Sequence, residues 1–184
     1  MKAVVTGVPG TGKTTVLNKA MEIGLKEKYK IVNYGDVMVE EAKSRNLVKN
    51  RDEMRKLDPE IQKEIQRNAA RKIGKMENVI VDTHASISTP KGYLPGLPEW
   101  VLREIMPDVI ILIEADPKEI SERRAKDTSR IRDIEEIESI NEHQQMNRAI
   151  AMSYATITGA TVAIVKNNNG KLEEAARKIF EILK

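Results

Sequence analysis

The chain has 184 residues, with 32% charged and only 3% aromatic side chains. Its 31 Lys and Arg nearly balance its 28 Asp and Glu, which argues against a dedicated nucleic-acid binder, and it has no cysteine for a disulfide, a thiolate metal site or a nucleophile. The longest purely apolar run, Val109 to Ile113, is too short to span a membrane and the N-terminus lacks the features of a signal peptide, so we expect one cytoplasmic domain without a membrane partner.

Short β-branched runs alternate with longer amphipathic segments along the chain. The runs are apolar throughout, as expected for parallel strands that are covered on both faces. The strand candidates are Ala3–Thr6, Ile31–Tyr34, Val79–Asp82, Val109–Glu114 and Thr161–Val165. Strands that alternate with helices predict an α/β fold with a doubly wound parallel sheet.

Two helix starts have clear capping signals. Asp58 is a suitable N-cap, and Pro59 is a suitable first residue, for a helix in the segment after the second strand. Asp116 begins another helix, with Glu119 placed to complete a capping box.

Further along, the pattern predicts a long helix over residues 134–157 and a last helix over 172–183. The segment 89–99 holds three prolines and two glycines, and we expect a long ordered loop there. Such loops often contribute to function.

A complete phosphate-binding motif follows the first strand. Residues 7–14, GVPGTGKT, match the pattern G-x-x-x-x-G-K-[ST] between a predicted strand and a predicted helix. The glycines let backbone N–H groups face phosphate oxygens, and the helix N-terminus adds partial positive charge. Lys13 would reach the β- and γ-phosphates, and the Thr14 hydroxyl would ligate Mg²⁺. The expected ATP-binding residues are Gly7, Val8, Pro9, Gly10, Thr11, Gly12, Lys13, Thr14 and Thr15.

An acidic residue ends the third predicted strand. In P-loop folds a carboxylate at the position of Asp82 commonly orients the water shell of Mg²⁺. The alternative is a cap on the following turn, which aspartate favours. Thr14 and Asp82 are therefore the predicted metal-binding residues, with Mg²⁺ as the cofactor.

The phosphate loop alone does not separate a kinase from a GTPase or an ATP-driven machine. The chain is too short for a helicase or transporter core, and it lacks the Asn-Lys-x-Asp tetrad of guanine-reading GTPases. A phosphoryl group in transfer spreads negative charge over its oxygens, so a kinase needs guanidinium groups that close over it. A salt-bridged helix face with Asp127 and Asp133 is the alternative for these arginines. They are Arg123, Arg124, Arg130 and Arg132.

Seven segments, in order over nearly the whole chain, carry a more specific signal. They are VTGVPGTGKTT, VNYGDVM, RDEMRKLD, VDTHASISTPKGYLPGLP, DTSRIRD, EHQQMNRA and TGATVAIVKN. Together they resemble the archaeal-type adenylate kinases. The resemblance implies the P-loop kinase fold, a five-stranded parallel sheet of order 2-3-1-4-5 with helices on both faces and a short lid. It also implies the reaction MgATP + AMP = 2 ADP and, often, a homotrimer.

The resemblance implies roles for individual residues. Asp36 and Arg55 would lie on the AMP side, with Arg55 a candidate ligand of the AMP phosphate. His84 would hydrogen bond to AMP or serve structure alone, and Asn167 would belong to the loop that supports the adenine of ATP. The implied catalytic residues are Lys13 and the lid charges Arg124, Arg130 and Arg132.

The resemblance also implies a division of the chain. Residues 1–184 would form one domain, in which 35–78 is an AMP-binding helical insertion and 123–133 is a short lid. The four arginines of 123–133, with Ile131 as the single large apolar residue, predict that this segment is mobile without nucleotide and that its arginines gain partners only when both nucleotides are bound. One departure concerns the AMP phosphate. Bacterial and eukaryotic adenylate kinases follow their strand-three aspartate with an AMP-binding arginine, whereas Thr83 and His84 follow Asp82 here.

Three functions remain open from the residues. The first is adenylate kinase, and the second is another small P-loop kinase that acts on a sugar, shikimate or a different nucleoside monophosphate. The third is a kinase-like ATPase that assists RNA or ribosome assembly. The balanced charge argues against the third function, and the family-specific segments argue against the second.

Overall fold

The computed structural model describes residues 1–126 and 134–184. A central sheet of five parallel strands runs in the order β2-β3-β1-β6-β7. The strands are β1 (Lys2–Thr6), β2 (Lys30–Asn33), β3 (Val79–Asp82), β6 (Val109–Glu114) and β7 (Thr161–Lys166). Among these five strands the order is 2-3-1-4-5, so the predicted fold class and strand order are confirmed.

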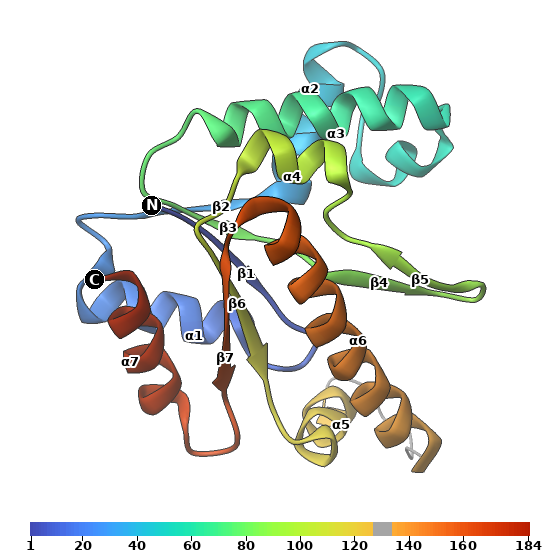
Figure 1. Ribbon diagram of the computed structural model, residues 1–184. Helices are drawn as coiled ribbons and strands as arrows, with labels where there is room; N and C mark the ends of the chain where they lie inside the picture. The colour runs from blue at the N-terminus through green and yellow to red at the C-terminus, as the bar shows by residue number, and fades with distance from the viewer. Residues whose placement is uncertain (127–133) are drawn as a thin grey trace.

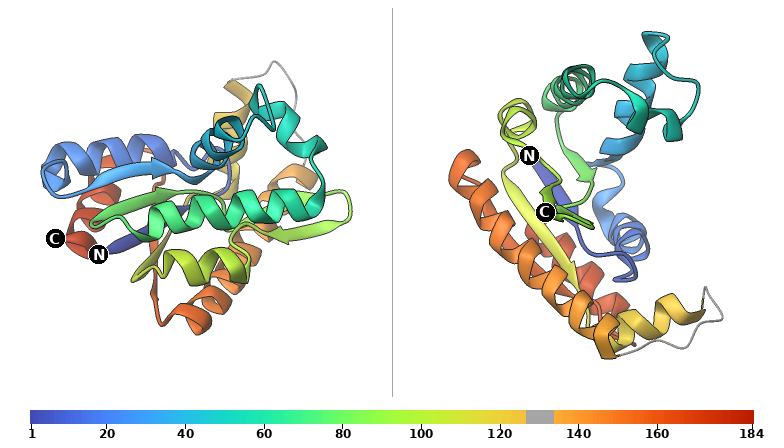
Figure 2. Two further views of the ribbon diagram at one scale, coloured as in Figure 1. Left: turned by 90° about the horizontal axis from the view of Figure 1, so that it is seen from above. Right: turned by 90° about the vertical axis from the view of Figure 1, so that its right-hand side faces the viewer.

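Helices cover both faces of this sheet (Figures 1 and 2). They are α1 (Lys13–Ala20), the π-helix η1 (Met21–Leu25), α2 (Tyr34–Ser44), the 3₁₀ helix η2 (Arg51–Lys56), α3 (Pro59–Gly74), α4 (Glu99–Ile105), α5 (Pro117–Lys126), α6 (Ile134–Thr158) and α7 (Leu172–Leu183). α1 and α7 pack on one face, whereas α3, α4 and α6 pack on the other. Within residues 1–126 and 134–184, no helix is long and apolar enough to cross a membrane.

Alternation along the central strands explains why they are apolar throughout. Ala3 and Val5 of β1 pack under α1 and α7, while Val4 between them packs under the helices of the opposite face. Ile111 and Ile110 of β6 divide between the two faces in the same way. Because both faces are covered, neither set of positions tolerates a polar side chain.

The structure corrects the predicted loop at residues 89–99. A second, two-stranded antiparallel sheet joins β4 (Ser86–Thr89) to β5 (Gly92–Pro95), with Ile87 opposite Leu94. Pro90 and Lys91 form the turn between them, Gly92, with φ of 118°, is the first residue of β5, and Pro95 is its last. Pro90 therefore lies in the turn of a hairpin and Pro95 at its end, and α4 begins at Glu99, where the prediction placed the end of the loop.

One capping prediction is confirmed and one is wrong. Asp58 accepts a hydrogen bond from the Glu60 N–H (2.9 Å), and Pro59 is the first residue of α3. At α5 the Asp116 carboxylate accepts from the Lys118 N–H (2.8 Å), as an N-cap does. Glu119 forms no capping box, because its carboxylate accepts from the N–H of Asn169 (2.7 Å) in the loop after β7.

The strand order places a functional edge at the carboxyl end of β1. The chain leaves β1 toward β2 on one side, and the later strands β6 and β7 lie on the other side. In open α/β sheets ligands bind at such a switch point. In the right panel of Figure 2, α2 and η2 lie at one end of the molecule and α5 lies at the other.

Candidate active site

The phosphate loop lies at this switch point, between β1 and α1. Gly10 and Gly12 have φ of 95° and 80°, a backbone region that favours glycine. A Cβ on Gly7 would lie 2.5 Å from the carbonyl oxygen of Ile113, so the loop passes directly against β6. Gly12, the N-cap of α1, has no side chain to cap the helix, which leaves its first N–H groups for an anion.

Side chains from distant parts of the chain hold the loop from outside. The side-chain amide of Asn167 donates to the carbonyl of Thr11 (2.7 Å). Arg123 donates to the carbonyls of Gly10 and Thr11 (3.3 Å each) and to that of Asn167 (2.8 Å). These bonds occupy carbonyl oxygens of Gly10 and Thr11 and hold the backbone of the loop in place.

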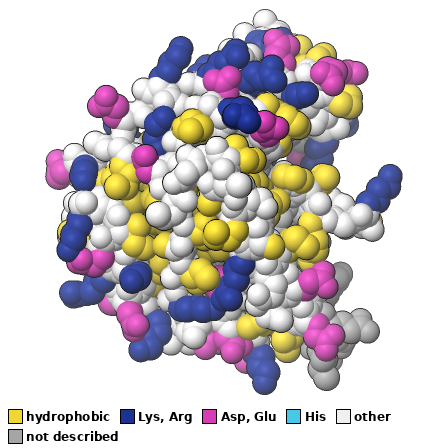
Figure 3. Space-filling view, in the orientation of Figure 1, with side chains coloured by type: hydrophobic (Ala, Val, Ile, Leu, Met, Phe, Trp, Pro, Cys, Tyr) yellow, Lys and Arg dark blue, Asp and Glu magenta, His cyan; other side chains and the backbone are white. Residues whose placement is uncertain are grey.

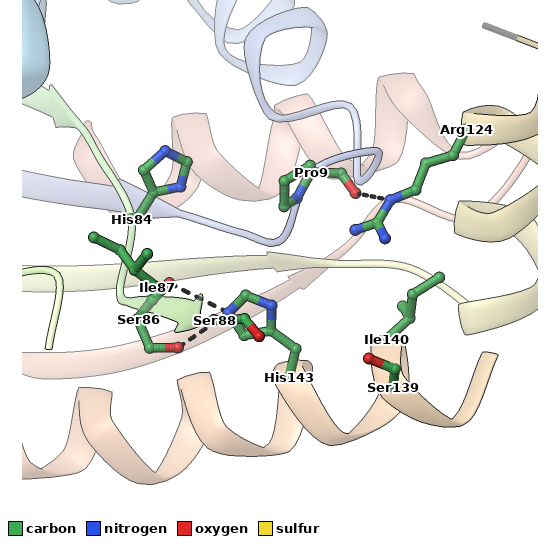
Figure 4. A pocket seen from close by; sticks show the side chains of 9 residues that line it. All are labelled: Pro9, His84, Ser86, Ile87, Ser88, Arg124, Ser139, Ile140 and His143. Carbon is green, nitrogen blue, oxygen red and sulfur yellow. Dashed lines mark hydrogen bonds between the residues drawn. The ribbon is translucent and has the colours of Figure 1, made fainter. Parts of the chain in front are cut away.

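Arg124, predicted as a lid charge, lies in α5 beside Arg123. Its Nε–H donates to the carbonyl of Pro9 (2.8 Å; Figure 4). We had expected these arginines to gain partners only when both nucleotides are bound, and for Arg123 and Arg124 that expectation is wrong. Arg130 and Arg132, the other two predicted lid charges, lie outside the described residues.

Lys13 and Asp82 form an ion pair between the start of α1 and the end of β3. Burial lowers the pKa of the Lys13 ammonium from 10.5 to about 8, because the charged form loses solvation there. The side chains are 16% and 15% exposed, so the pair is accessible from the site. The hydroxyl-bearing residues Thr14 and Thr15, at the start of α1, are exposed.

A cavity of about 270 Å³ opens beside the outer side of the phosphate loop. It brings together Thr15, the Arg123 side chain and the loop that follows β7. The lining residues are Gly12, Thr15, Arg123, Asn167, Asn168, Asn169, Gly170 and Leu172. Asn167, which was predicted to belong to the loop that supports the adenine of ATP, lines this cavity. Its side-chain amide donates to the carbonyl of Thr11.

A second cavity, of about 310 Å³, opens on the opposite side of Lys13. It brings together four of the predicted residues: Lys13, Arg55, Asp82 and His84. Asp36 does not line it. The Asp36 carboxylate accepts from the guanidinium of Arg51 (2.5 Å), and Arg51 does line the cavity.

Several lining residues of the second cavity were not predicted. Arg51 lies four positions before Arg55 in the RDEMRKLD segment, so this segment contained the signal. Gln66 of α3 also lines the cavity, and its side-chain oxygen accepts from the indole N–H of Trp100 (3.0 Å). An exposed-looking glutamine in an amphipathic helix gives no such signal. The other lining residues are Asn33, Tyr34, Gly35, Met38, Val39, Met54, Thr83, Ile87, Pro95, Gly96 and Pro98.

His84 lies where the second cavity meets a third, of about 440 Å³, between the phosphate loop, β4 and α6 (Figure 4). Its ring is accessible yet set in a concave surface. Partial burial lowers the pKa of His84, and the charge of Lys13 lowers it further. His84 therefore faces the site as a neutral ring near neutral pH. His143 of α6 has Nε2 at 3.1 Å from the hydroxyl of Ser86.

An enzyme that passes a phosphoryl group between two bound molecules needs a binding site on each side of the phosphate loop, and the two cavities meet this need. The fold and the site together are those of a P-loop phosphotransferase. A family model described as an AAA domain matches residues 6–141. The relatives narrow this class, and the chain belongs to the adenylate kinase family.

These relatives match along the whole chain. The adenylate kinase of Methanocaldococcus jannaschii is 55% identical over 98% of this chain and 97% of its own length. That of Thermoplasma acidophilum is 55% identical over 100% and 98%, and that of Methanopyrus kandleri is 57% identical over 98% and 96%. The predicted family and the predicted adenylate kinase activity are thereby confirmed.

Solved structures with low identity share the fold. A shikimate kinase from Acinetobacter baumannii superposes with a TM-score of 0.57 at 12% identity, over 98% of this chain and 91% of that chain. One from Aquifex aeolicus gives 0.56 at 18% identity, over 100% and 96%. At this identity the likeness supports the P-loop kinase fold alone.

Proposed function

We propose that ATP and AMP bind on opposite sides of Lys13 and that the γ-phosphoryl group passes directly between them. The observation that carries this proposal is the position of Lys13, which belongs to the phosphate loop and also lines the cavity beside Arg55. ATP takes the phosphate loop and the cavity beside Asn167, and AMP takes the cavity beside Arg55 and His84. The attacking AMP phosphate is already anionic, so the transfer needs no general base.

On the ATP side, the backbone of residues 7–15 and the N-terminus of α1 bind the triphosphate. Lys13 neutralises charge that develops on the transferred group. Phosphate oxygens take the place of Asp82 as partners of the Lys13 ammonium. This exchange fits the lowered pKa of Lys13, because burial leaves its ammonium poorly solvated and phosphate oxygens would stabilise the charged form.

We assign Mg²⁺ to Thr14 and Asp82. A hydroxyl and a carboxylate are the hard oxygen donors that Mg²⁺ prefers, and the metal keeps several waters and phosphate oxygens as its other ligands. The Asp82 carboxylate lies at the end of β3 beside the phosphate loop, which fits this donor set. Mg²⁺ held by these residues would supply positive charge that neutralises the phosphate oxygens.

On the AMP side, Arg55 and Arg51 are the proposed phosphate ligands. Both residues line the cavity that Lys13 also lines. Their guanidinium groups would supply the charge that the arginine after the strand-three aspartate supplies in bacterial and eukaryotic adenylate kinases. Asp36 orients Arg51 through their ion pair. His84, as a neutral ring, is the proposed hydrogen-bond partner of AMP.

A coupled ADP assay over AMP, CMP, UMP, GMP and shikimate tests this function. We expect turnover with AMP far above that with each other acceptor. Higher turnover with another monophosphate would contradict the assignment of the AMP cavity, and ATP hydrolysis without any acceptor would contradict direct transfer.

The division of the chain stays a proposal. We assign residues 35–78, which include α2, η2 and α3, to AMP binding, and residues 123–133 to a short lid. A kinase must exclude water from the transferred group. Hydrogen exchange over 123–133 should therefore slow when a bisubstrate analogue binds, and an unchanged exchange rate would argue against the lid.

A homo-oligomer, by resemblance a homotrimer, is also proposed. Figure 3 shows apolar side chains over the middle of the face on which α6 and β7 lie. Met152 and Ile157 of α6 are 58% and 39% exposed, and Ile164 of β7 is 40% exposed. Analytical ultracentrifugation decides the oligomeric state. A cytoplasmic location fits an enzyme whose substrates are ATP and AMP, and we propose it on that ground.

A further inference from the structure

Helix α6 presents two neighbouring rows of polar side chains to the rest of the protein. Residues four positions apart lie above one another on a helix. Gln144 and Arg148 form the first row. His143 and Asn147, each one position earlier in the sequence, form the second row. Gln144 and Asn147 are buried, which is unusual for amides unless they are hydrogen bonded.

The first row holds the carboxyl end of β6. The Gln144 side chain pairs with the backbone of Ala115 through both of its groups, accepting from the N–H (3.1 Å) and donating to the carbonyl (3.0 Å). Arg148 donates two hydrogen bonds to the Glu114 carboxylate (2.7 and 2.6 Å). Burial alone would raise the pKa of Glu114, but these bonds and those of Lys166 outweigh it, so the pKa is lowered.

Two hydrogen bonds connect this strand end to the phosphate loop. The carbonyl of Glu114 accepts from the N–H of Asn167 (2.7 Å). The side chain of the same Asn167 donates to Thr11 (2.7 Å). A shift of the strand end would therefore move Asn167 and with it the wall of the ATP side.

The second row holds the backbone beside His84. The Ser86 hydroxyl donates to the Asn147 side-chain oxygen (2.6 Å), and His143 Nε2 lies 3.2 Å from the Ser86 carbonyl oxygen. Further along α6, the Tyr154 hydroxyl donates to the carbonyl of Ala85 (2.6 Å). The residues bound are therefore the two that follow His84.

We infer that α6 positions both substrate sites, with Gln144 and Arg148 as positioning residues for ATP and Asn147 as a positioning residue for AMP. This inference rests on the proposed assignment of the two cavities. Each row acts on one side because its bonds end on different strands, β6 for one row and β4 for the other. Apolar packing alone tolerates small rotations of a helix, whereas a paired amide or a forked guanidinium fixes its register.

The test compares Gln144→Ala with Asn147→Ala. Loss of one such hydrogen-bonded contact corresponds to about a fivefold change in an equilibrium constant. We expect Gln144→Ala to raise the KM for ATP about fivefold and leave that for AMP within about twofold, and Asn147→Ala to do the reverse. The exposed neighbours of the same types, Gln145→Ala and Asn141→Ala, are the controls and should change neither constant.

A binding measurement separates positioning from a loss of chemistry. Trp100 is the single tryptophan of the chain and is bonded to Gln66 in the AMP cavity, so its fluorescence reports AMP binding without turnover. Asn147→Ala should raise the Kd for AMP by the factor seen in KM, with kcat changed less. Where a truncated variant does not fold, Arg148→Lys and Ser86→Ala test the same two rows with smaller changes.

Equal effects of the two variants on both substrates, or no effect of either, would overturn the inference. The site assignments have their own test in Arg55→Ala and Asn167→Ala. If each of those two variants changes the KM of one substrate only and the α6 variants do not, the role of α6 is contradicted while the proposed function stands. If Arg55→Ala and Asn167→Ala also fail to do so, the assignment of the cavities fails.

Discussion

The two sides of the active site differ in how firmly they are held before substrate arrives. On the ATP side, Asn167, Arg123 and Arg124 each bond the backbone of the phosphate loop. On the AMP side, η2 has no buried residue, and the Arg51–Asp36 pair has side chains that are 60% and 76% exposed. Exposed pairs of this kind contribute at most about 1 kcal/mol to stability.

This difference indicates where each side obtains its binding energy. On the ATP side, little free energy of binding is lost to ordering the site, because hydrogen bonds within the protein already fix its donors. The AMP side has charged side chains on a short 3₁₀ helix. These side chains contribute most of their binding energy only when they form charge-assisted hydrogen bonds to a phosphate. The following substitutions test that contrast.

Lys13→Ala gives the largest expected effect, because Lys13 belongs to both sides. Loss of one preorganised electrostatic group costs on the order of a hundredfold in turnover, so we expect at least that loss. The measurement is steady-state ADP formation, with a melting curve to show that the fold is retained. Lys19→Ala, near the end of α1, is the control, and near-normal turnover in Lys13→Ala would remove the loop from catalysis.

Arg55→Ala should separate the two sides. A charge-assisted hydrogen bond to phosphate contributes about 1.5–3 kcal/mol, so the KM for AMP should rise tenfold or more while that for ATP changes little. Initial rates with each substrate varied in turn provide both constants. Arg103→Ala, an exposed arginine of α4 paired with Glu99, is the matched control. Equal changes in both constants would place Arg55 outside the AMP site.

Asn167→Ala tests the bracing of the ATP side. The variant removes the shorter of two side-chain hydrogen bonds to the carbonyl of Thr11 and leaves only the one from Arg123 (3.3 Å), and we expect the KM for ATP to rise about fivefold. Calorimetry with a non-hydrolysable ATP analogue should show the same factor in Kd. Asn18→Ala, an exposed asparagine of α1, serves as the control. An unchanged Kd would mean that the loop holds its shape without this bond.

The smallest expected effect is a pH dependence of ATP binding. The pKa of Lys13 is about 8 in the free enzyme, and a bound triphosphate raises it by attraction. Below that pKa both states are protonated, so affinity is independent of this group. Above it the free enzyme has lost the proton that the complex takes up, and affinity falls as pH rises.

Calorimetry in two buffers with different ionisation enthalpies measures the proton uptake directly. Uptake should appear above the pKa of Lys13, disappear below it, and be lost in Lys13→Ala but kept in Lys19→Ala. Equal uptake in Lys13→Ala would assign the proton to another group.

The contrast between the two sides also explains what was predictable. The phosphate loop is local in sequence, because its glycines, Lys13 and the helix start follow one another, and the structure brings them together as expected. Arg124 was assigned from its charge and from the family resemblance, neither of which indicates its bond to Pro9, because that bond depends on how α5 packs. Gln66 and Gln144 have no local signal, since their partners lie 34 and 29 positions away. The hairpin at 86–95 was missed because prolines and glycines predict turns but not the strands they join.

The central position of β1 has a consequence for how the chain folds. Residues 2–6 are made before both of their neighbours in the sheet, which are residues 79–82 and 109–114. The ammonium group of Lys2 likewise donates hydrogen bonds to the carbonyls of two residues that are made much later, Gly74 and Ile105 (2.9 Å each). Such long-range pairing slows folding, and an unpaired apolar strand is prone to aggregate while it waits. During synthesis the first strand therefore has both of its neighbours only after residue 114 has left the ribosome.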